Sequence, residues 1–545
     1  MTDINAWRAR VEKELAGASF DRLVTKTPEG LAIQPLYTER VVDPAPPGVA
    51  PFVRGACAEA APFAICMRAA ADALEDDLAG GADALWLKDG DRAALQAALG
   101  HGLGVVIDAE GTPEREHFEA VTHARFAWLG FDPIDEVWRG ELAASALPRR
   151  LAELAGFAPQ LQRDGAPVRS VRVSSLGYHG AGADAADELA LVLATAAAYL
   201  RALVEEGLGV ADAARAMWAQ VAVGRDTFGE LCKLRALRLV WWKLFAAAGV
   251  PDAALQLHAV CSPRTQALRD PWVNMLRVTT EVFAAVLGGA QVVTPAAFDE
   301  AFGAASPLGR RTARNTALVL REESHLGRVL DAGGGSYYLE ARTDALAREA
   351  WSRFTAIERE GGIVARLPAI RERLAEAWQV RAAAIARRKE PVLGVSEFAN
   401  LGEKLPAALP AAPAGHRDGE QFEALRARVE GTRDVVLVTL GEPAEYRARV
   451  GYAQAFFATA GLATREVPWS ATLPLPSRNA IACLCGSDDR YALEAVAAAA
   501  MLRESGYRVV LAGRPGPLEA ALRAGGVTCI FIGCDVLATL EELTR

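Results

Sequence analysis

The sequence predicts an α/β protein built from a (β/α)8 TIM barrel and a following flavodoxin-like, Rossmann-like doubly wound domain. Two series of short apolar runs alternating with amphipathic helical segments support this prediction, one on each side of a Pro/Ala-rich stretch at residues 407–415. A chain of 545 residues is also too long for one hydrophobic core. We therefore expect an N-terminal arm at residues 1–50, a barrel with a helical extension at 51–390, a linker at 391–432 and the second domain at 433–545.

The first element along the chain is the arm. Trp7, Val11 and Leu15 recur at near-helical spacing, and a polar run then leads to Tyr37. This segment has no strand partner in the sequence, so we expect it to wrap another surface.

The barrel prediction comes from eight apolar runs, most of them separated by amphipathic segments. That content is expected of a (β/α)8 barrel, and runs that are apolar on both faces fit parallel strands covered by helices. The runs lie at residues 63–67, 84–87, 104–107, 126–130, 168–175, 216–223, 255–261 and 291–294.

Small or polar residues occur late in two of these runs, namely Ser174 with Ser175 and Cys261 with Ser262. A barrel interior is normally filled by Val, Ile and Leu, so small residues there would leave room for a ligand along the axis. Alternatively, these residues already belong to the loops after the strands.

The second domain shows a fresh alternation after strongly helical residues 300–385. Five strands interleaved with helices are the flavodoxin-like pattern. The strands are expected at residues 435–440, 463–467, 480–485, 509–512 and 529–532.

Composition narrows the classes of function. A net charge of −9 argues against a nucleic-acid partner, and no apolar run is long enough to span a membrane. The first residues lack the features of a signal peptide, which favours the cytoplasm. Eight cysteines without a C-x-x-C pair indicate reduced core thiols, so no metal site is expected.

Spaced motifs between residues 277 and 362 resemble the methylmalonyl-CoA mutase family, and a weaker resemblance covers the rest of the chain from Pro35 onward. Chance agreement at so many spaced positions is remote. The motifs lie at residues 277–281, 286–291, 298–301, 313–316, 321–324 and 331–340, followed by Trp351, Ile357, Glu358, Gly361 and Gly362.

Within this family the chain resembles the small, non-catalytic (beta) subunit rather than the cobalamin-binding large (alpha) subunit. Aligned on Ala-Gly-Ala, His179 stands about two residues out of register with the catalytic histidine. It is either a displaced catalytic group or a histidine satisfied at a strand end. No tyrosine occurs between Tyr37 and Tyr178, and Arg54 lies in a shortened coenzyme A-contacting stretch. Tyr178, His179 and Arg54 are therefore vestigial candidates, and no catalytic residue is expected.

The second domain resembles the family's cobalamin-binding domain, but it lacks the ligand residues. No histidine occurs between residues 417 and 545. The family's Asp-x-His-x-x-Gly pattern falls on Ala444, Tyr446 and Arg449, which removes the imidazole suited to cobalt. Later paired glycines become Gly513 and Arg514, and an arginine there would fill the groove. These positions are therefore degenerate, and no cofactor is expected on this chain.

The resemblance implies a role in a heterodimer. A homologous large subunit would hold adenosylcobalamin and interconvert (R)-methylmalonyl-CoA and succinyl-CoA, while this chain stabilises it. One alternative is a self-sufficient acyl-CoA mutase with an atypical cobalamin site. Another is a mutase-associated accessory protein, such as a GTPase-type chaperone, although the sequence has no phosphate-binding loop motif.

Overall fold

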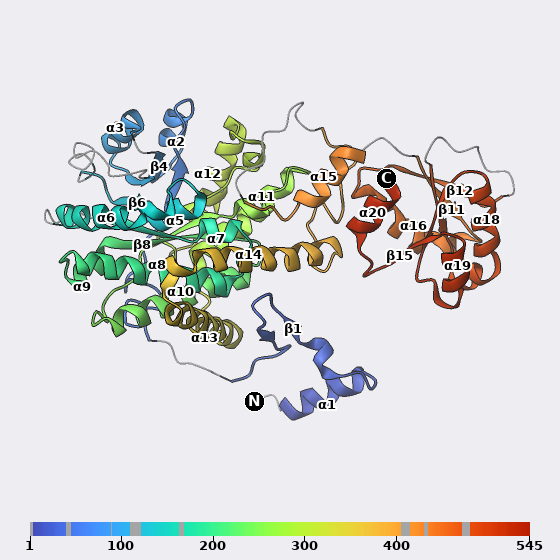
Figure 1. Cartoon of the computed structure of the whole chain (residues 1–545), viewed down its shortest axis with the longest axis horizontal. Helices are drawn as coiled ribbons and strands as arrows, with labels where there is room; N and C mark the ends of the chain where they lie inside the picture. Colours follow the sequence, from blue (N-terminus) through green and yellow to red (C-terminus); the bar gives the residue numbers. More distant parts are fainter. Residues whose placement is uncertain are drawn as a thin grey trace. The chain divides into compact units, whose positions relative to one another are not determined.

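The computed structural model describes residues 4–39, 45–88, 90–108, 121, 123–162, 168–404, 415–429, 434–470 and 480–545. Two compact units are present. The first comprises residues 1–264, 275–300 and 304–378, and the second comprises residues 265–274, 301–303 and 379–545. Figure 1 shows the barrel strands and helices of the first unit in blue to yellow and the second sheet in orange to red.

Eight parallel strands close into a barrel in the order β10-β3-β4-β5-β6-β7-β8-β9. Each strand falls within or overlaps one of the eight apolar runs, so the predicted barrel is confirmed. The strands are β3 (Ala64–Arg68), β4 (Ala84–Lys88), β5 (Gly104–Asp108), β6 (Ala127–Phe131), β7 (Val168–Ser174), β8 (Met217–Val223), β9 (Leu257–Cys261) and β10 (Val292–Thr294).

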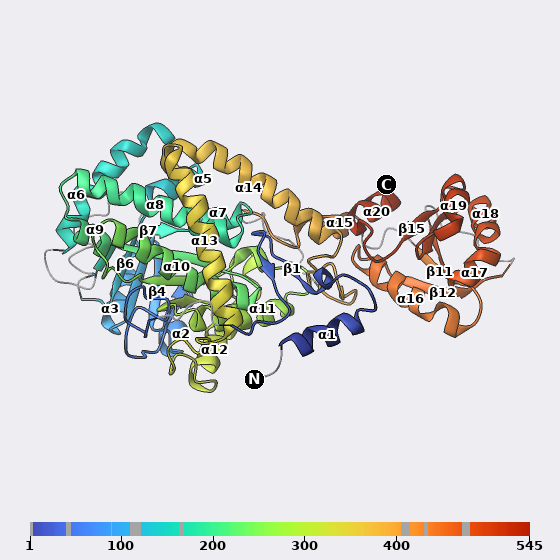
Figure 2. The same cartoon turned by 90° about the horizontal axis from the view of Figure 1, so that it is seen from below.

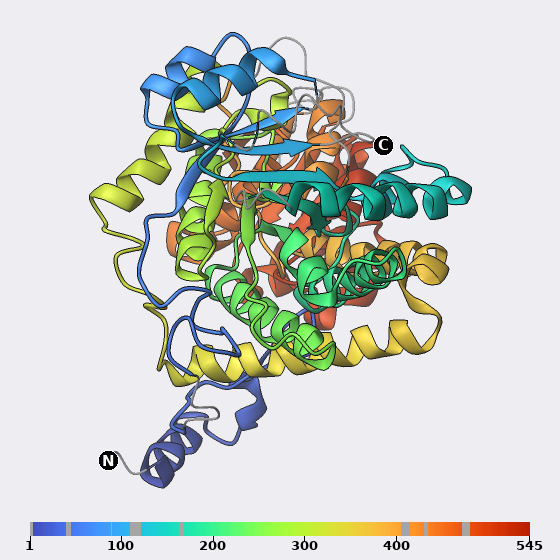
Figure 3. The same ribbon diagram turned by 90° about the vertical axis from the view of Figure 1, so that its left-hand side faces the viewer.

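Helices surround these strands (Figure 3). They are α2 (Leu74–Ala79), α3 (Arg92–Gly100), α5 (Pro133–Arg139), α6 (Leu147–Gln162), α7 (Leu176–Gly180), α8 (Ala185–Glu205), α9 (Val210–Ala216), α10 (Thr227–Ala247), α11 (Trp272–Leu287) and α12 (Pro307–Glu322). Short 3-10 turns lie at η2 (Ala144–Ala146), η3 (Pro263–Thr265) and η4 (Glu300–Phe302). Outward residues such as Ile65, Leu85 and Val171 join the core between strands and helices.

Two long helices follow the barrel, α13 (Tyr337–Arg359) and α14 (Gly362–Ala386). Helix α13 packs against α8 and α10 (Figure 2). The turn before α8 requires a glycine, because Gly182 has φ 110° and an added Cβ would lie 2.7 Å from Cβ of Trp378. This close approach explains the glycine of the Ala181-Gly182-Ala183 motif.

The arm begins with α1 (Ile4–Glu14), η1 (Phe20–Leu23) and an antiparallel pair, β1 (Thr25–Lys26) with β2 (Ala32–Ile33). The helix confirms the spacing of Trp7 and Val11, whereas the strand pair was not foreseen from the sequence. No residue of α1 is buried. Trp7 contacts Phe20 edge-on, with 6.2 Å between ring centroids.

The second unit contains five parallel strands in the order β12-β11-β13-β14-β15. Numbered along the chain this order is 2-1-3-4-5, that of flavodoxin-like folds, which confirms the prediction. The strands are β11 (Val435–Thr439), β12 (Thr464–Pro468), β13 (Ile481–Cys485), β14 (Arg508–Ala512) and β15 (Thr528–Ile530).

Alternate residues of these strands face two helical layers. One layer contains α15 (Glu420–Val429), α16 (Pro443–Ala458) and α20 (Val536–Thr544). The other contains a continuous helix made of α17 (Asp488–Arg490), the π-helical turn η5 (Tyr491–Ala495) and α18 (Val496–Glu504), with η6 (Gly516–Leu518) and α19 (Glu519–Ala524).

The expected linker at residues 391–432 is described only in part, since residues 405–414 and 430–432 lie outside the described residues. Its described remainder includes α15, whose Phe422 and Leu425 are buried. The boundaries at 390 and 433 stay a prediction. Among the helices in the described part of the chain, none combines the length and apolar character that crossing a membrane requires.

Candidate functional site

Three tryptophan side chains fill the axis of the barrel. Trp86, Trp128 and Trp218 come from β4, β6 and β8, which are not neighbours, yet they belong to one buried cluster. Such strands can meet only inside the barrel, so these are the inward positions of the strand alternation. The ring centroids of Trp128 and Trp218 are 5.4 Å apart, and Trp218 Nε1 donates to Leu129 O at 2.9 Å. The axis is therefore packed at this level.

A polar layer adjoins the tryptophans. Nε2 of His258 lies 2.8 Å from Oγ1 of Thr294, and Gln220 Nε2 donates to His258 Nδ1 at 3.2 Å. Burial lowers the pKa of His258 to about 3, helped by Arg68 and Arg172. This histidine is therefore neutral and serves as a buried hydrogen-bonding group.

The small residues late in the strands do not open a channel. Ser174 contacts Gln220 in the polar layer at 3.5 Å, and Cys261 joins the outer core. Ser175 and Ser262 bind members of the His179 cluster described below. All four side chains are buried. The interpretation that they leave room for a ligand on the axis is wrong, because aromatic side chains from other strands occupy it.

A cluster of three aspartate side chains surrounds Arg172 on β7. Its guanidinium donates to Asp108 and lies 3.8 Å from Asp132 and 3.6 Å from Asp135. Asp132 also accepts from the backbone N–H of Ser174 at 2.8 Å. Burial and the neighbouring Asp135 raise the pKa of Asp132 to about 7. Because Asp132 is also the N-cap of α5, these contacts tie the start of that helix to β7.

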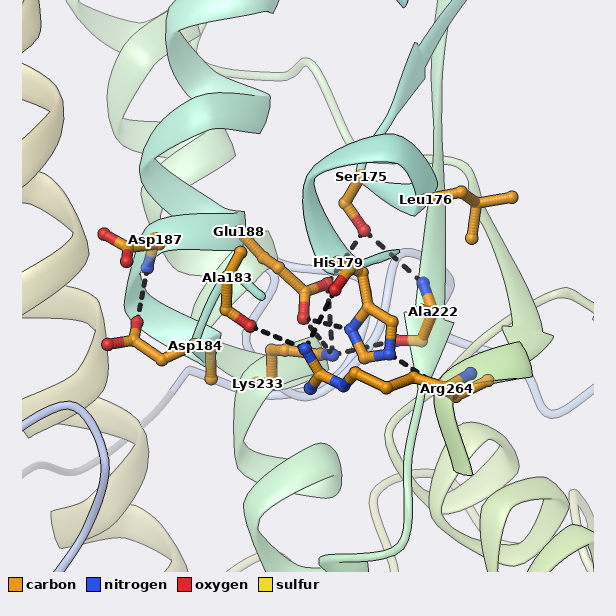
Figure 4. Close-up of polar contacts among 12 residues, drawn as sticks. Ser175, Leu176, His179, Ala183, Asp184, Asp187, Glu188, Ala222, Lys233 and Arg264 are labelled. Carbon is orange, nitrogen blue, oxygen red and sulfur yellow. Dashed lines mark hydrogen bonds and ion pairs between the residues drawn. The ribbon is translucent and has the colours of Figure 1, made fainter. Parts of the chain in front are cut away.

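His179 lies in α7, directly after β7, at the centre of a buried cluster (Figure 4). Its Nδ1 lies 2.7 Å from Oε1 of Glu188 on α8, and its Nε2 lies 2.6 Å from Oγ of Ser262. A carboxylate can only accept, so we assign the proton to Nδ1 and Ser262 as the donor to Nε2. Serine, histidine and glutamate are thus arranged as in a nucleophilic relay. However, Ser262, His179 and Glu188 are 0%, 1% and 2% exposed, so no face of Ser262 is open to a substrate.

The charges in this cluster compensate one another. Lys233 Nζ lies 3.4 Å from Glu188 Oε2 and 2.6 Å from Glu230 Oε2, and it donates to Ala222 O at 2.8 Å. Burial alone would raise the pKa of Glu188, but Lys233 and His179 lower it to about 2. Burial and Arg264 lower the pKa of His179 to about 4. The cluster therefore holds an ionised Glu188 and a neutral His179.

Backbone contacts complete the cluster. Nη1 of Arg264 donates to the carbonyl oxygens of His179 at 2.9 Å and Ala183 at 3.0 Å. Arg264 thereby fixes both ends of the turn that carries His179, as Figure 4 shows.

Tyr178 neighbours His179 in α7, but its side chain lies in the apolar core. Its ring contacts Trp138 edge-on, with 4.8 Å between centroids, and its hydroxyl lies 3.3 Å from Thr195 Oγ1. Burial raises the pKa of Tyr178 well above its usual value. Tyr178 is 2% exposed.

Arg54 lies at the opposite end of the barrel from His179. Its Nε donates to Asp331 Oδ2 at 2.9 Å, and it lines a cavity of about 630 Å³. This cavity lies against the first residues of several strands, including Ala64 and Val168, whereas His179 follows the last residue of β7. The structure therefore places Tyr178 and His179 together and Arg54 apart from them.

The cavity is cationic and ends at aromatic side chains. Phe126 and Trp128 line it, so the filled axis begins at its inner wall. Arg238 and Arg169 also line it, and both use backbone carbonyl groups as acceptors. Burial and the neighbouring Arg235 lower the pKa of Arg238 to about 9.

In the second unit, Tyr491 closes the carboxyl edge of the sheet. Ligands of open α/β sheets bind outside the carboxyl ends of the strands, and Tyr491 lies over the ends of β13 and β14. The Tyr491 hydroxyl lies 2.8 Å from Ala512 O and accepts from the Gly486 N–H at 3.0 Å. The guanidinium carbon of Arg449 lies 5.9 Å from the centroid of this ring, and Nη2 donates to Asp488 at 2.8 Å.

The other degenerate positions surround this closure. Ala444 is exposed and Tyr446 is half-buried in the first turns of α16. A Cβ on Gly513 would lie 2.4 Å from Arg449 Nη1, so this glycine makes room for the guanidinium. The sequence predicted that Arg514 would fill the groove beside this glycine, whereas in the structure the side chains that lie against Gly513 are those of Arg449 and Tyr491. Arg514 is exposed and lies over Phe531 at 5.4 Å.

Several contributors to these sites were missed by sequence reasoning. Glu188 and Lys233 come from two different helices, and no local motif joins them to His179. The tryptophans left a signal, since Trp86 and Trp128 interrupt short aliphatic runs at inward positions. Within the described ranges, no group of three His, Cys, Asp or Glu side chains could hold a metal ion.

A closed parallel barrel followed by a separate flavodoxin-like sheet defines the structural class. The family model described as methylmalonyl-CoA mutase matches residues 132–445. The chain therefore belongs to the methylmalonyl-CoA mutase family.

Relatives that match most of the chain carry a more particular name. The chain is 38% identical to the methylmalonyl-CoA mutase small subunit of Streptomyces virginiae, over 97% of this chain and 93% of that protein. It is 35% identical to the probable small subunit of Mycobacterium tuberculosis, over 92% and 89%. It is 33% identical to the small subunit of Propionibacterium freudenreichii, over 76% and 68%.

Proposed function

We propose that this chain is the small, non-catalytic subunit of a heterodimeric, adenosylcobalamin-dependent methylmalonyl-CoA mutase. A homologous large subunit holds the cofactor and interconverts (R)-methylmalonyl-CoA and succinyl-CoA. This chain contributes interface area and stability to that subunit, in the cytoplasm. The names of the relatives support the assignment to a small subunit.

The filled barrel axis is the observation that carries this proposal. An acyl-CoA substrate that threaded the barrel, as the small residues late in two strands suggested, would need open space along the axis. Trp128 and Trp218 lie in that path and are 5% and 0% exposed. Interiors are packed as densely as organic crystals, so these rings cannot move aside without rearranging the core.

The residues of the second unit do not fit a corrin. Tyr446 stands at the position of the cobalt-binding imidazole and is partly buried against the core. A tyrosine side chain contains no nitrogen, so it cannot supply the neutral nitrogen ligand that histidine gives to cobalt. The carboxyl ends of β13 and β14 are covered by Tyr491 and Arg449, which are held by hydrogen bonds. The cofactor of the complex therefore belongs to the large subunit.

We also propose that His179 has a structural role. Both ring nitrogens already have partners within 2.7 Å, and the pKa of about 4 keeps the ring neutral near pH 7. General acids and bases work best with a pKa near the operating pH. His179 thus links α7, α8 and the end of β9, and Tyr178 and Arg54 serve in packing and in an ion pair.

The domain boundaries form part of the proposal. The arm at residues 1–50 would contact the large subunit, because α1 buries none of its own residues. Residues 51–390 would form the mutase-type barrel with its helical extension, residues 391–432 the linker and residues 433–545 the degenerate domain.

Turnover by separated and mixed subunits tests the proposal. The purified chain with adenosylcobalamin and (R)-methylmalonyl-CoA should form no succinyl-CoA. A mixture with the homologous large subunit should form it and should elute as a complex containing both chains. Succinyl-CoA formation by this chain alone would instead favour a self-sufficient mutase. Failure to associate with the large subunit would contradict the heterodimer.

A further inference from the structure

The cavity that Arg54 lines carries positive charge that the described carboxylates do not fully neutralise. Its described lining includes five arginines, Arg54, Arg125, Arg169, Arg215 and Arg238. Two of these, Arg54 and Arg215, pair with aspartates. No carboxylate of the described residues pairs with Arg169 or Arg238, and burial lowers the pKa of these groups to about 10 and about 9. A buried charge without a counter-charge is costly, so this wall favours an anion from solution.

Arg238 on α10 is the most deeply buried of these cations, at 2% exposure. Its Nε donates to the carbonyl oxygen of Phe52 at 3.1 Å, and its Nη2 donates to that of Val53 at 3.2 Å. Its Nη1 is buried and has no hydrogen-bond partner among the described residues. This nitrogen lies against Gly289 in the cavity wall, where an added Cβ would be 2.9 Å away. One nitrogen of a buried guanidinium is thus left for a ligand.

The segment that Arg238 holds leads directly to a thiol at the same cavity. Cys57 follows Val53 by four positions and lines the cavity. It is exposed, whereas the other seven cysteines are buried or half-buried. Reactive cysteines are typically accessible and close to positive charge, and an anionic reagent is drawn to such a place. The cavity therefore joins an accessible thiol to cations that lack a counter-charge.

Two exposed charges of opposite sign also line this cavity, Glu59 and Arg125. Glu59 lies two positions after Cys57 and opposes the approach of an anion, whereas Arg125 favours it. Solvent and salt screen both charges, so each has a modest effect. Because both side chains are exposed, they can be replaced without opening the core, and they form a matched pair for testing the charge of the cavity.

We propose that this cavity receives the carboxylate end of a low-molecular-weight disulfide and that Cys57 exchanges with it. The Cys57 thiol loses its proton to water, and Sγ attacks one sulfur of the disulfide. A bond forms between Sγ and that half of the molecule, the original S–S bond breaks, and the other half leaves as a thiolate that takes up a proton. Cys57 is oxidised and the leaving half is reduced, so no further oxidant is needed. This modification goes beyond the subunit role proposed above and does not depend on it.

Disulfides of similar size and different charge test this proposal. The full chain is mixed at low ionic strength with anionic dithiodipropionate, neutral hydroxyethyl disulfide or cationic cystamine. Mass spectrometry of the intact chain measures the rate at which one half is added, and peptide mapping locates it. The matched control moves the thiol, by combining Cys57→Ser with Leu276→Cys at a leucine 63% exposed on α11. This control corrects for the different intrinsic reactivities of the reagents.

The rate with dithiodipropionate divided by the rate with cystamine should be at least about tenfold higher at Cys57 than at the moved thiol. High salt should bring the two ratios together, because it screens the attraction. Equal ratios at the two thiols in low salt would overturn the proposal. Addition at another cysteine of the wild-type chain, with Cys57 left unmodified, would also overturn it.

Charge variants test whether the cavity itself attracts the reagent. Arg125→Gln should lower the rate with dithiodipropionate by a few-fold, and Glu59→Gln should raise it by a similar factor. Both should leave the rate with neutral hydroxyethyl disulfide unchanged, since the thiol stays accessible. Arg238→Gln should lower the anionic rate most, and circular dichroism checks its folding because Arg238 also holds Phe52. Unchanged anionic rates in the two exposed variants would contradict an anion site in this cavity, whether or not Arg238→Gln folds.

Discussion

The barrel axis, where small residues had suggested room for a ligand, and the carboxyl edge of the second sheet, where open α/β sheets bind ligands, are both filled in this chain, by different means. The axis contains tryptophans that are nearly inaccessible, such as Trp218 at 0% exposure. The sheet edge contains buried Tyr491, covered by Arg449, whose side chain is 31% exposed and pairs with an 80% exposed Asp488. The first filling is part of a hydrophobic core and the second ends in a solvated ion pair.

This difference indicates how readily each site could be reopened. Removing a ring from the axis leaves a cavity inside close-packed strands, at a large cost in stability. Removing Arg449 breaks only a partly solvated ion pair, so the expected loss of stability is small. We therefore expect that opening the barrel axis would destabilise the fold. Opening the sheet edge would cost little stability, but it would not create a cobalamin site because the ligand residues are missing.

The largest expected effect is on the axis. Trp218→Ala should lower the free energy of unfolding of the barrel by about 3–5 kcal/mol, because it removes a large buried ring and the Nε1 hydrogen bond. Urea denaturation followed by circular dichroism measures the change. The matched control is Trp272→Ala, at a tryptophan 58% exposed, which should cost less than about 1 kcal/mol. Similar costs for the two variants would show that the axis is not packed as described.

The next effect is the pH dependence of the His179 cluster. The folded pKa of about 4 lies below the usual value of 6.5. Between these values the unfolded chain binds a proton that the folded chain does not, so stability falls as the pH is lowered from 6.5 toward 4. His179 alone contributes about 3 kcal/mol to this loss.

Denaturation curves of wild type and His179→Gln across that pH range measure the contribution. The variant should lose less stability on acidification than wild type, although His258 retains its own dependence because its pKa is lowered to about 3. Parallel curves for the two proteins would contradict a buried, neutral His179.

A smaller effect is expected at the sheet edge. Arg449→Ala should change the free energy of unfolding by no more than about 1 kcal/mol, because its partner is solvated. It should also leave cobalamin retention after desalting at background, since removing the guanidinium supplies no imidazole. Corrin absorbance measures retention. Stoichiometric binding by the variant would show that steric filling alone had excluded the cofactor.

The smallest effect is expected on turnover. His179→Gln in the reconstituted complex should leave the kcat for succinyl-CoA formation within a few-fold of wild type. Loss of a working acid or base typically costs about 10²–10⁴ in rate. A decrease of that size in an intact complex would mean that this chain has a catalytic site.

Sequence patterns could predict the strands because their signal is local. Apolar runs such as that ending at Met67 coincide with strands. The alternation of strands and helices after residue 433 likewise predicted a flavodoxin-like sheet, and the observed strand order agrees with it. Whether a side chain points into the barrel, and what it meets there, can be predicted only when the register of every strand is known. For this reason Ser174 and Ser262 suggested open space, although Trp128 and Trp218 fill it from other strands.

The candidate site was predictable only in part. His179 was found through a motif, and its out-of-register position suggested a histidine satisfied at a strand end. Its partners Glu188 and Ser262 lie 9 and 83 residues away along the chain, and only the closed barrel brings them together. In the second domain, the missing ligands could be read from the sequence, whereas the closure by Tyr491 depends on the three-dimensional edge of the sheet.

The cobalamin content of the reconstituted complex tests the central claim most directly. The complex of this chain with its large subunit is saturated with adenosylcobalamin and desalted, and corrin is measured against the amounts of both chains. The account predicts one corrin for each pair of chains and none on this chain when it is treated alone. Two corrins per pair, or stoichiometric corrin on this chain alone, would contradict a non-catalytic subunit.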